Sequence, residues 1–152
     1  MKKSMRNGSV LALSGLVLCL CFSIACQDKA AIAELEKYNA QSTVEQQNMA
    51  LVAKTFGELN KKNAGIYQEL YAPDYSWYFP ANNLKPLTRE EEAGFVKLLW
   101  DAFPDIRWEI VEMFAGGERV AVRFAVMGTH TNEYQGLPPT GKAFESGGVW
   151  IG

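Results

Sequence analysis

The chain has 152 residues but only three cysteines and one histidine. The cysteines are Cys19, Cys21 and Cys26, all close to the N-terminus. The remainder of the chain therefore has no disulfide and offers no thiolate ligand to zinc. With His130 as the only imidazole, a metal would depend on carboxylates, and no Asp/Glu cluster has ligand spacing. The sequence predicts no metal site.

Other functional signatures are also missing. The segment 136–142 contains Gly, Thr and Lys, but two prolines stand where a phosphate-binding loop needs backbone N–H donors. No Gly-x-Ser-x-Gly elbow indicates serine catalysis. Lys and Arg number 15 against 17 Asp and Glu, and no basic stripe is present. We therefore expect no nucleic-acid partner.

The N-terminus has the pattern of a targeting signal. Three basic residues lie within the first six positions, and residues 10–24 are almost wholly apolar. This apolar run suits a signal peptide and is too short for a comfortable membrane span. It ends in the sequence SIAC at positions 23–26, which resembles the lipobox of bacterial lipoproteins, in which the Cys thiol receives a lipid. Cleavage without lipidation and an uncleaved anchor are the alternatives.

This resemblance implies a division of the chain and a location. We expect a lipoprotein signal peptide over 1–26, lipidation at Cys26, a tether over 27–41 and one domain over 42–152. The only membrane contact would be the lipid anchor. The protein would lie in the bacterial cell envelope. Because Gln27 follows the cysteine, it would reach the outer membrane if one exists.

Helices are expected in the first half of the domain. Ser42 and Glu45 have the spacing of a capping box, and apolar residues recur at helical intervals over 43–62. A short helix is predicted over 66–71. A second capping box, Thr88 to Glu91, opens a helix that ends before Pro104. Its predicted apolar face consists of Phe95, Leu98, Leu99 and Ala102.

Strands dominate the rest of the domain. The aromatic segment 75–79 has strand propensity. Long strands are predicted over 106–114, 119–131 and 142–151, with a glycine turn after the first. Helices followed by a run of antiparallel strands indicate an α+β fold.

Five short segments carry a resemblance to a known family. They are YAPDY at 71–75, AFPD at 102–105, RVAVRF at 119–124, GTHT at 128–131 and LPPTGK at 137–142. In this order and spacing they resemble the SnoaL-like polyketide cyclases, also called ester cyclases. The resemblance implies a cone-shaped fold like nuclear transport factor 2 and ketosteroid isomerase, with three helices on a strongly curved antiparallel sheet around a pocket. It also implies a homodimer and a cofactor-free intramolecular aldol condensation that uses an acid/base side chain.

The chain departs from the family pattern at its end. Family members continue into a last strand that carries an acidic residue, whereas this chain stops at Gly152. Val149 stands where many relatives have an acidic or polar side chain. From this comparison the domain is expected to lack its last strand, and the expected catalytic carboxylate is absent.

His130 and Tyr78 are the candidate catalytic residues. His130 falls on the apolar face of its predicted strand, at the strand's end, where a titratable group could serve as base or donor. A histidine bonded to nearby backbone, or one at a dimer edge, is the alternative. Tyr78 is the best candidate for a polar donor. Trp77, Trp108 and Phe124 are expected to line the pocket, with plain core packing as the alternative.

Two functions fit these observations. The first is a cofactor-free cyclase or isomerase that acts on a small apolar carbonyl compound. The second is a non-catalytic lipoprotein that binds a small hydrophobic ligand. The same fold can host both functions.

Overall fold

The computed structural model describes residues 6–79 and 85–152, with side chains from residue 29 onward. The predicted lipidation site, Cys26, lies outside the described side chains. The chain divides into two compact units, Met1–Thr43 and Val44–Gly152. Within the described residues, no helix combines the length and apolar character that a membrane crossing needs. The first unit is helical from Arg6 onward, and its side chains Ile32, Leu35 and Tyr38 are exposed.

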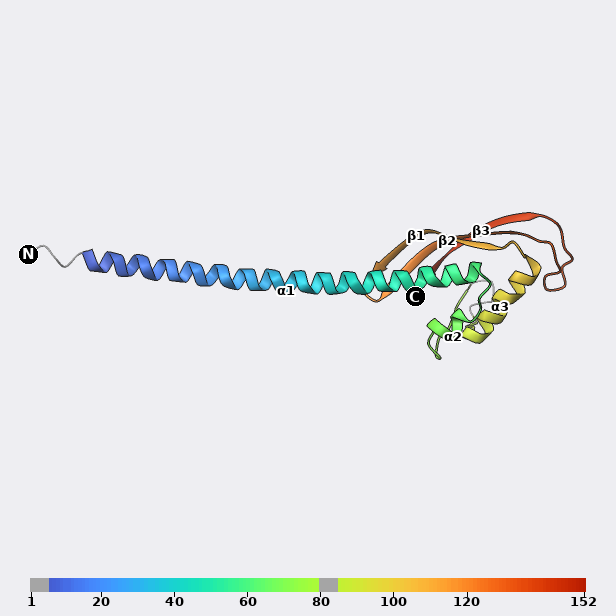
Figure 1. Ribbon diagram of the computed structural model, residues 1–152, viewed down its shortest axis with the longest axis horizontal. Helices are drawn as coiled ribbons and strands as arrows, with labels where there is room; N and C mark the ends of the chain where they lie inside the picture. The colour runs from blue at the N-terminus through green and yellow to red at the C-terminus, as the bar shows by residue number, and fades with distance from the viewer. Residues whose placement is uncertain (1–5, 80–84) are drawn as a thin grey trace, which may run out of the picture. The chain divides into compact units, whose positions relative to one another are not determined.

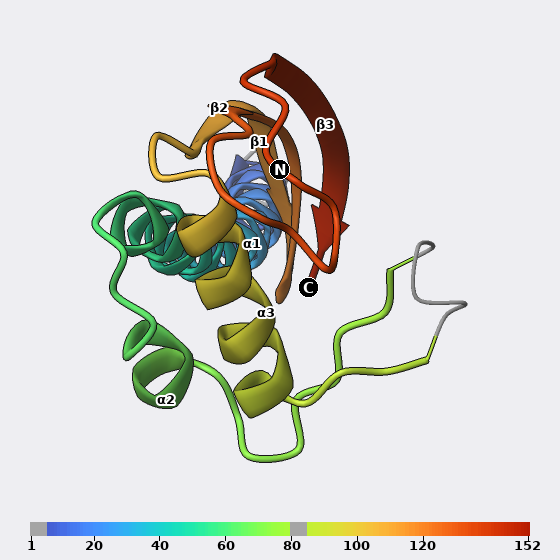
Figure 2. The ribbon, with the colours of Figure 1, turned by 90° about the vertical axis from the view of Figure 1, so that its right-hand side faces the viewer.

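The second unit is α+β, as predicted, and its elements are labelled in Figure 1. Three strands form one antiparallel sheet in the order β1-β2-β3. The elements are α1 (Arg6–Asn60, of which the second unit holds the last part), α2 (Ile66–Leu70), α3 (Arg89–Ala102), β1 (Arg107–Gly116), β2 (Arg119–Thr129) and β3 (Ala143–Ile151). Figure 2 shows β3 as a strongly curved ribbon with α3 on the concave side of the sheet.

The predicted helix start at Ser42 is wrong. Helix α1 continues through this position, because the preceding Ala-, Gln-, Glu- and Lys-rich segment favours helix and supplies no break. Glu45 does not cap the helix either. Its carboxylate accepts a hydrogen bond of 2.8 Å from the backbone N–H of Gly117, in the β1–β2 turn. Gly117 has a φ of 62°, which glycine adopts without strain.

The predicted capping box of α3 is confirmed. The Thr88 hydroxyl accepts from the Glu91 N–H, and the Glu91 carboxylate accepts from the Thr88 N–H. Of the predicted apolar face, Ala102 is buried and Phe95 and Leu99 pack against the core, whereas Leu98 is 51% exposed. The buried residues of the helix are Glu92, Val96, Trp100 and Ala102.

The predicted strand 75–79 is not a full strand. Only Trp77 pairs, through two backbone hydrogen bonds of 2.9 Å with Leu87. A single bridge leaves the neighbouring aromatic side chains free to pack on one another. Phe79 stacks on Trp77 with ring centroids 4.4 Å apart.

Strand β2 shows the predicted alternation. Val120 and Val122 are buried and Phe124 and Val126 are half-buried on the same face, whereas Arg123 is exposed on the other face and pairs with a carboxylate of β1. The sheet bends where β1 carries a bulge between Ile110 and Glu112.

Two glycines let β3 pass close to β2. A Cβ on Gly147 would lie 2.7 Å from the backbone oxygen of Phe124, and one on Gly148 would lie 3.1 Å from the Phe124 ring. The Phe124 ring therefore occupies space that a side chain on β3 would otherwise fill. At Gly148 the face of β3 is therefore covered by the Phe124 ring and not by a side chain of its own.

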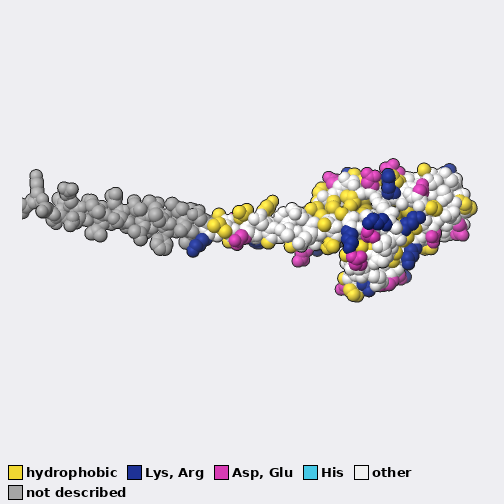
Figure 3. All heavy atoms as spheres, viewed as in Figure 1, with side chains coloured by type: hydrophobic (Ala, Val, Ile, Leu, Met, Phe, Trp, Pro, Cys, Tyr) yellow, Lys and Arg dark blue, Asp and Glu magenta, His cyan; other side chains and the backbone are white. Residues whose placement is uncertain are grey.

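The core lies between the helices and the sheet. Its buried members come from all three helices and from the start of the sheet: Leu59, Ile66, Tyr67, Val96, Trp100, Ile106 and Trp108. Asn60 fastens the end of α1 to the outer edge of β1, since its side-chain amide makes two hydrogen bonds of 2.8 Å with the backbone of Trp108. On the face shown in Figure 3, acidic and basic side chains are interspersed over the second unit.

Candidate active site

The second unit contains a cavity of about 850 Å³. Its walls come from the end of α1, from α2, from α3, from the segment around Trp77 and from the inner face of the sheet. The exposed side chains Tyr78, Val149 and Ile151 are part of this lining. Most of the lining is aliphatic or aromatic. Among the lining side chains that the structure describes, that of Glu92 alone carries a formal charge.

Glu92 is buried, with 8% of its surface exposed. Glutamate is almost never this buried without a partner, because removing an ionised carboxylate from water is costly. Its Oε1 accepts a hydrogen bond of 3.3 Å from the hydroxyl of Tyr67, which is itself 1% exposed. Its Oε2 has no hydrogen-bond partner among the described residues. One carboxylate oxygen is therefore held in place, and the other is available.

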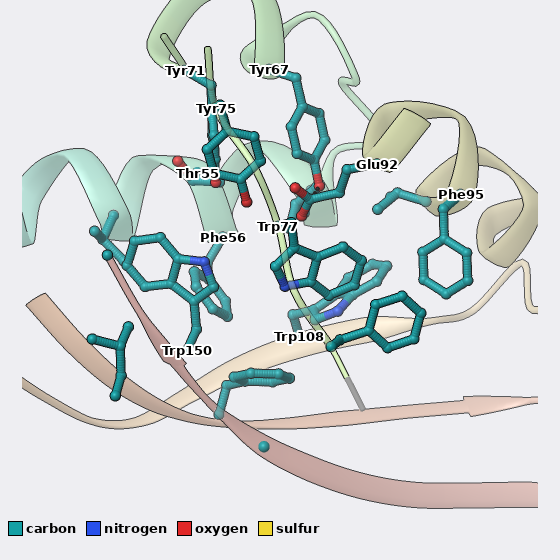
Figure 4. A pocket seen from close by; sticks show the side chains of 18 of the residues that line it. Thr55, Phe56, Tyr67, Tyr71, Tyr75, Trp77, Glu92, Phe95, Trp108 and Trp150 are labelled. Atoms are coloured by element: carbon teal, nitrogen blue, oxygen red, sulfur yellow. Dashed lines mark hydrogen bonds between the residues drawn. The ribbon is translucent and has the colours of Figure 1, made fainter. Parts of the chain in front are cut away.

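Tyr75 stands on the other side of the carboxylate. Figure 4 shows Tyr67 and Tyr75 flanking Glu92. The buried Tyr75 hydroxyl makes no hydrogen bond of good geometry with any described residue. Tyr71 lies next to it, with its ring in edge contact with the Tyr75 ring and the centroids 4.6 Å apart. The cavity thus has one polar end, where a carboxylate oxygen and the nearby Tyr75 hydroxyl interact without a hydrogen bond of good geometry.

The pKa values of this cluster are shifted by burial. Desolvation raises the pKa of Glu92 from 4.5 to about 7, although the hydroxyls of Tyr75 and Tyr67 partly oppose the shift. Burial and the nearby carboxylate raise the pKa of Tyr71 to about 12. The same two causes raise the pKa values of Tyr67 and Tyr75 further. Near neutral pH, Glu92 can therefore release and accept a proton, while the three phenols remain neutral donors.

Aromatic rings form the other walls. Trp77 and Phe79 stack on each other, and both lie within 6 Å of Phe95 by ring centroids. Phe56 of α1 contacts Phe124 of β2 at 5.6 Å. Such rings provide a flat apolar surface on which a planar or hydrophobic molecule can lie.

Four of the five residues proposed from the sequence for the pocket or its chemistry lie at this cavity. Trp77, Trp108, Phe124 and Tyr78 all belong to the lining. Trp108 also belongs to the core cluster, so the pocket and core-packing interpretations both describe it. Tyr78 is 59% exposed, and it is therefore a poor candidate for a donor in a dry site.

His130 is not brought to this cavity. Its ring packs against Phe103 at 5.2 Å, and its Nδ1 lies 3.3 Å from the hydroxyl of Thr140. Its backbone is fixed by hydrogen bonds with Gly141 and Lys142. The ring makes no hydrogen bond to the described backbone, and its Nε2 is buried without a hydrogen-bond partner among the described residues, so the role of His130 stays a prediction.

Sequence reasoning missed Glu92, Tyr67 and Tyr75. A signal for Glu92 was present, because it precedes Val96 by four residues and Trp100 by eight. These positions share one face of a helix, and a lone carboxylate on an apolar face is a mark of function. Glu92 is not the carboxylate that the family resemblance led us to expect in a last strand. It comes from α3 and lines the cavity.

The fold and the cavity define a class of protein: an α+β cone of the type found in nuclear transport factor 2. Residues 50–151 match the family model of the SnoaL-like polyketide cyclases. The chain belongs to this family, as its sequence segments predicted. No curated protein resembles the chain closely enough to count as a match.

Solved structures agree with this placement. IdmH from Streptomyces antibioticus, a candidate polyketide cyclase, is 28% identical, with a TM-score of 0.62 over 69% of this chain and 81% of its own. A candidate SnoaL-like polyketide cyclase from Jannaschia sp. CCS1 is 21% identical, with a TM-score of 0.63 over 71% and 76%. AclR from Streptomyces galilaeus, a candidate hydroxylase, is 22% identical, with a TM-score of 0.62 over 70% and 78%. The last two show the fold alone.

Proposed function

We propose that this protein is a cofactor-free cyclase or isomerase that acts on a small, apolar carbonyl compound, with Glu92 as its acid/base residue. The single observation that carries the proposal is the buried carboxylate of Glu92, which has one free oxygen facing an apolar cavity. A general base works best when its pKa is close to the operating pH, and burial brings the pKa of Glu92 to about 7.

The proposed chemistry needs three groups. The Glu92 carboxylate removes a proton from the carbon next to a carbonyl, and the electron pair moves onto the carbonyl oxygen to give an enolate. The Tyr75 hydroxyl, which lacks a partner in the structure, donates to that oxygen. Tyr67 holds the other oxygen of Glu92 and fixes the direction of the carboxylate.

For a ring closure, the enolate carbon attacks a second carbonyl of the same molecule. A carbon–carbon bond forms, and the new alkoxide takes back the proton from Glu92. For an isomerisation, the proton returns to a different carbon. Both routes leave Glu92 unchanged, and both benefit from aromatic walls that exclude water.

The proposal can be tested without the natural substrate. β-Tetralone is an apolar ketone with acidic α-protons, and its exchange of hydrogen for deuterium in D₂O can be followed by NMR. The wild-type protein should accelerate this exchange above the buffer rate. Glu92→Gln should reduce the enzymatic rate by about 10²-fold or more, which is typical of a lost general base. Tyr75→Phe should reduce it by about 10²-fold through the lost donor.

Two control variants sharpen the test. Glu109→Gln removes an exposed carboxylate on β1 and should leave exchange unchanged. His130→Gln separates the two candidate bases, because it should keep the rate if Glu92 is the base. Full activity of Glu92→Gln together with loss in His130→Gln would reject the assignment and restore the one made from the sequence.

A non-catalytic hydrophobic-ligand carrier is the second candidate. The apolar lining of the cavity favours it. In the same experiment, β-tetralone would then bind, seen as shifted ketone resonances, while its exchange stayed at the buffer rate in every variant.

We further propose that the protein is anchored in the bacterial envelope by a lipid on Cys26. The support is the basic, apolar and SIAC pattern of residues 1–26. A homodimer, which the family resemblance implies, also stays a prediction.

A further inference from the structure

The cavity combines one buried acid with many aromatic rings and no basic side chain among its described lining residues. A carboxylate in a protein interior is normally matched by Lys, Arg, His or a metal. Here the available partners of Glu92 are neutral phenols, and its Oε2 has none. Any negative charge on Glu92 therefore has no compensating charge in the cavity.

The aromatic walls have the complementary property. The faces of indole and phenol rings carry partial negative charge and attract cations. Figure 4 shows Trp77, Trp150 and Tyr75 around the space into which the Glu92 carboxylate points. A positive group in that space would meet a carboxylate oxygen and ring faces together. An anion there would meet the Glu92 carboxylate and the ring faces, and among the described lining residues only neutral hydroxyl and indole N–H donors.

We propose that the cavity binds an apolar organic monocation, whose ammonium group pairs with the Glu92 carboxylate while its hydrocarbon body lies against the aromatic walls. This inference goes beyond the proposed carbonyl chemistry and does not rest on it, because it needs only binding. The volume of about 850 Å³ accommodates a molecule of drug-like size.

Three ligands with one carbon skeleton test the charge preference: phenylbutylamine, phenylbutanol and phenylbutyrate. Their affinities for the full chain can be measured by isothermal titration calorimetry near pH 8. The amine should bind at least about tenfold more tightly than the alcohol, because it adds an ion pair with Glu92 in a desolvated site. The acid should bind more weakly than the alcohol.

Variants of Glu92 assign the effect to this side chain. Glu92→Gln should bring the affinity for the amine down to that for the alcohol, while the affinity for the alcohol stays unchanged. Glu92→Asp keeps the charge and should retain part of the preference, and it serves if the glutamine variant does not fold. Glu109→Gln, which removes an exposed carboxylate of β1, is the matched control and should bind as the wild type does.

The preference should also depend on pH. The titratable groups around Glu92 are Tyr67, Tyr71 and Tyr75, and burial raises their pKa values above the range of the experiment. An alkylammonium also keeps its charge throughout this range. Only Glu92, with a pKa of about 7, changes charge. Affinity for the amine should therefore rise from about pH 5 to about pH 8 by the factor that separates amine from alcohol, at least about tenfold, while affinity for the alcohol stays flat.

The outcomes are distinct from those of the exchange assay. Equal affinities for amine and alcohol in the wild type, or a preference that survives in Glu92→Gln, would overturn the cation site. Either result would leave the role of Glu92 in β-tetralone exchange untouched. Conversely, a protein that prefers the amine but exchanges no deuterium would support this inference and reject the cyclase proposal.

Discussion

Replacing Glu92 by glutamine should make the protein more stable at neutral pH, although it removes a group from the proposed active site. Burial raises the pKa of Glu92 in the folded chain to about 7, against 4.5 for an unperturbed carboxyl. The folded state therefore holds a proton that the unfolded chain releases between these values. Stability from this group is fully present below about pH 4.5 and is lost as the pH rises through about 7.

The size of the effect follows from the shift. Each unit of pKa corresponds to about 1.4 kcal/mol, so a shift from 4.5 to about 7 amounts to about 3 kcal/mol above pH 7. This is a large part of the roughly 5–15 kcal/mol that stabilises an ordinary domain. Glutamine has nearly the same shape, carries no charge at any pH and keeps an oxygen for the Tyr67 hydroxyl.

Urea melts of both proteins from about pH 4 to about pH 8 would measure this difference. We expect the unfolding free energies to coincide near pH 4 and to diverge as the pH rises, with Glu92→Gln ahead by up to about 3 kcal/mol. Glu109→Gln, at an exposed site, should follow the wild type at every pH. Parallel curves for wild type and Glu92→Gln would refute the buried, uncompensated carboxylate on which both proposals depend.

Three further predictions concern the scaffold and the anchor. Gly147→Ala should lower the unfolding free energy by about 1–3 kcal/mol, because its Cβ would lie 2.7 Å from a backbone oxygen of β2. The control Gly148→Ala should cost less, because its Cβ would meet only a ring atom at 3.1 Å. Equal unfolding free energies for the two variants would contradict this. Asn60→Ala should cost about 1–3 kcal/mol in urea melts, because it leaves the backbone N–H and C=O of Trp108 without partners at the edge of β1. Cys26→Ala should move the protein from the detergent phase to the aqueous phase in phase partitioning; unchanged partitioning after signal cleavage would exclude the lipid anchor.

Local signals predicted the helices and strands well where the cause was local. The capping box at Thr88 needs only residues three positions apart, and it forms as expected. The alternation of β2 needs only the period of a strand. The capping box at Ser42 failed because a cap requires the preceding residues to leave the helix, and nothing in that segment makes them do so.

The site depended on contacts that no local pattern contains. Alternation predicted a face of the sheet for His130, but it could not show how far along the strand the cavity extends. The lining of β2 includes Val126, and four more residues of extended chain reach about 13 Å further. His130 consequently meets Phe103 and Thr140 instead of the cavity. Tyr67 and Tyr75 approach Glu92 only because the chain folds α2 and the following loop against α3.

The position of Glu92 is hard to explain by stability. A leucine or glutamine at this helix position would fill similar space without a penalty above pH 7. The carboxylate is instead kept among neutral phenols, with one oxygen unpaired, beside an open cavity. Buried groups that reduce stability persist where a reaction or a ligand uses them. If Glu92→Gln is more stable and has lost both deuterium exchange and the preference for amines, then the Glu92 carboxylate is responsible both for the lower unfolding free energy of the wild type and for its function. If Glu92→Gln is more stable and retains both activities, the Glu92 carboxylate destabilises the fold without serving either function.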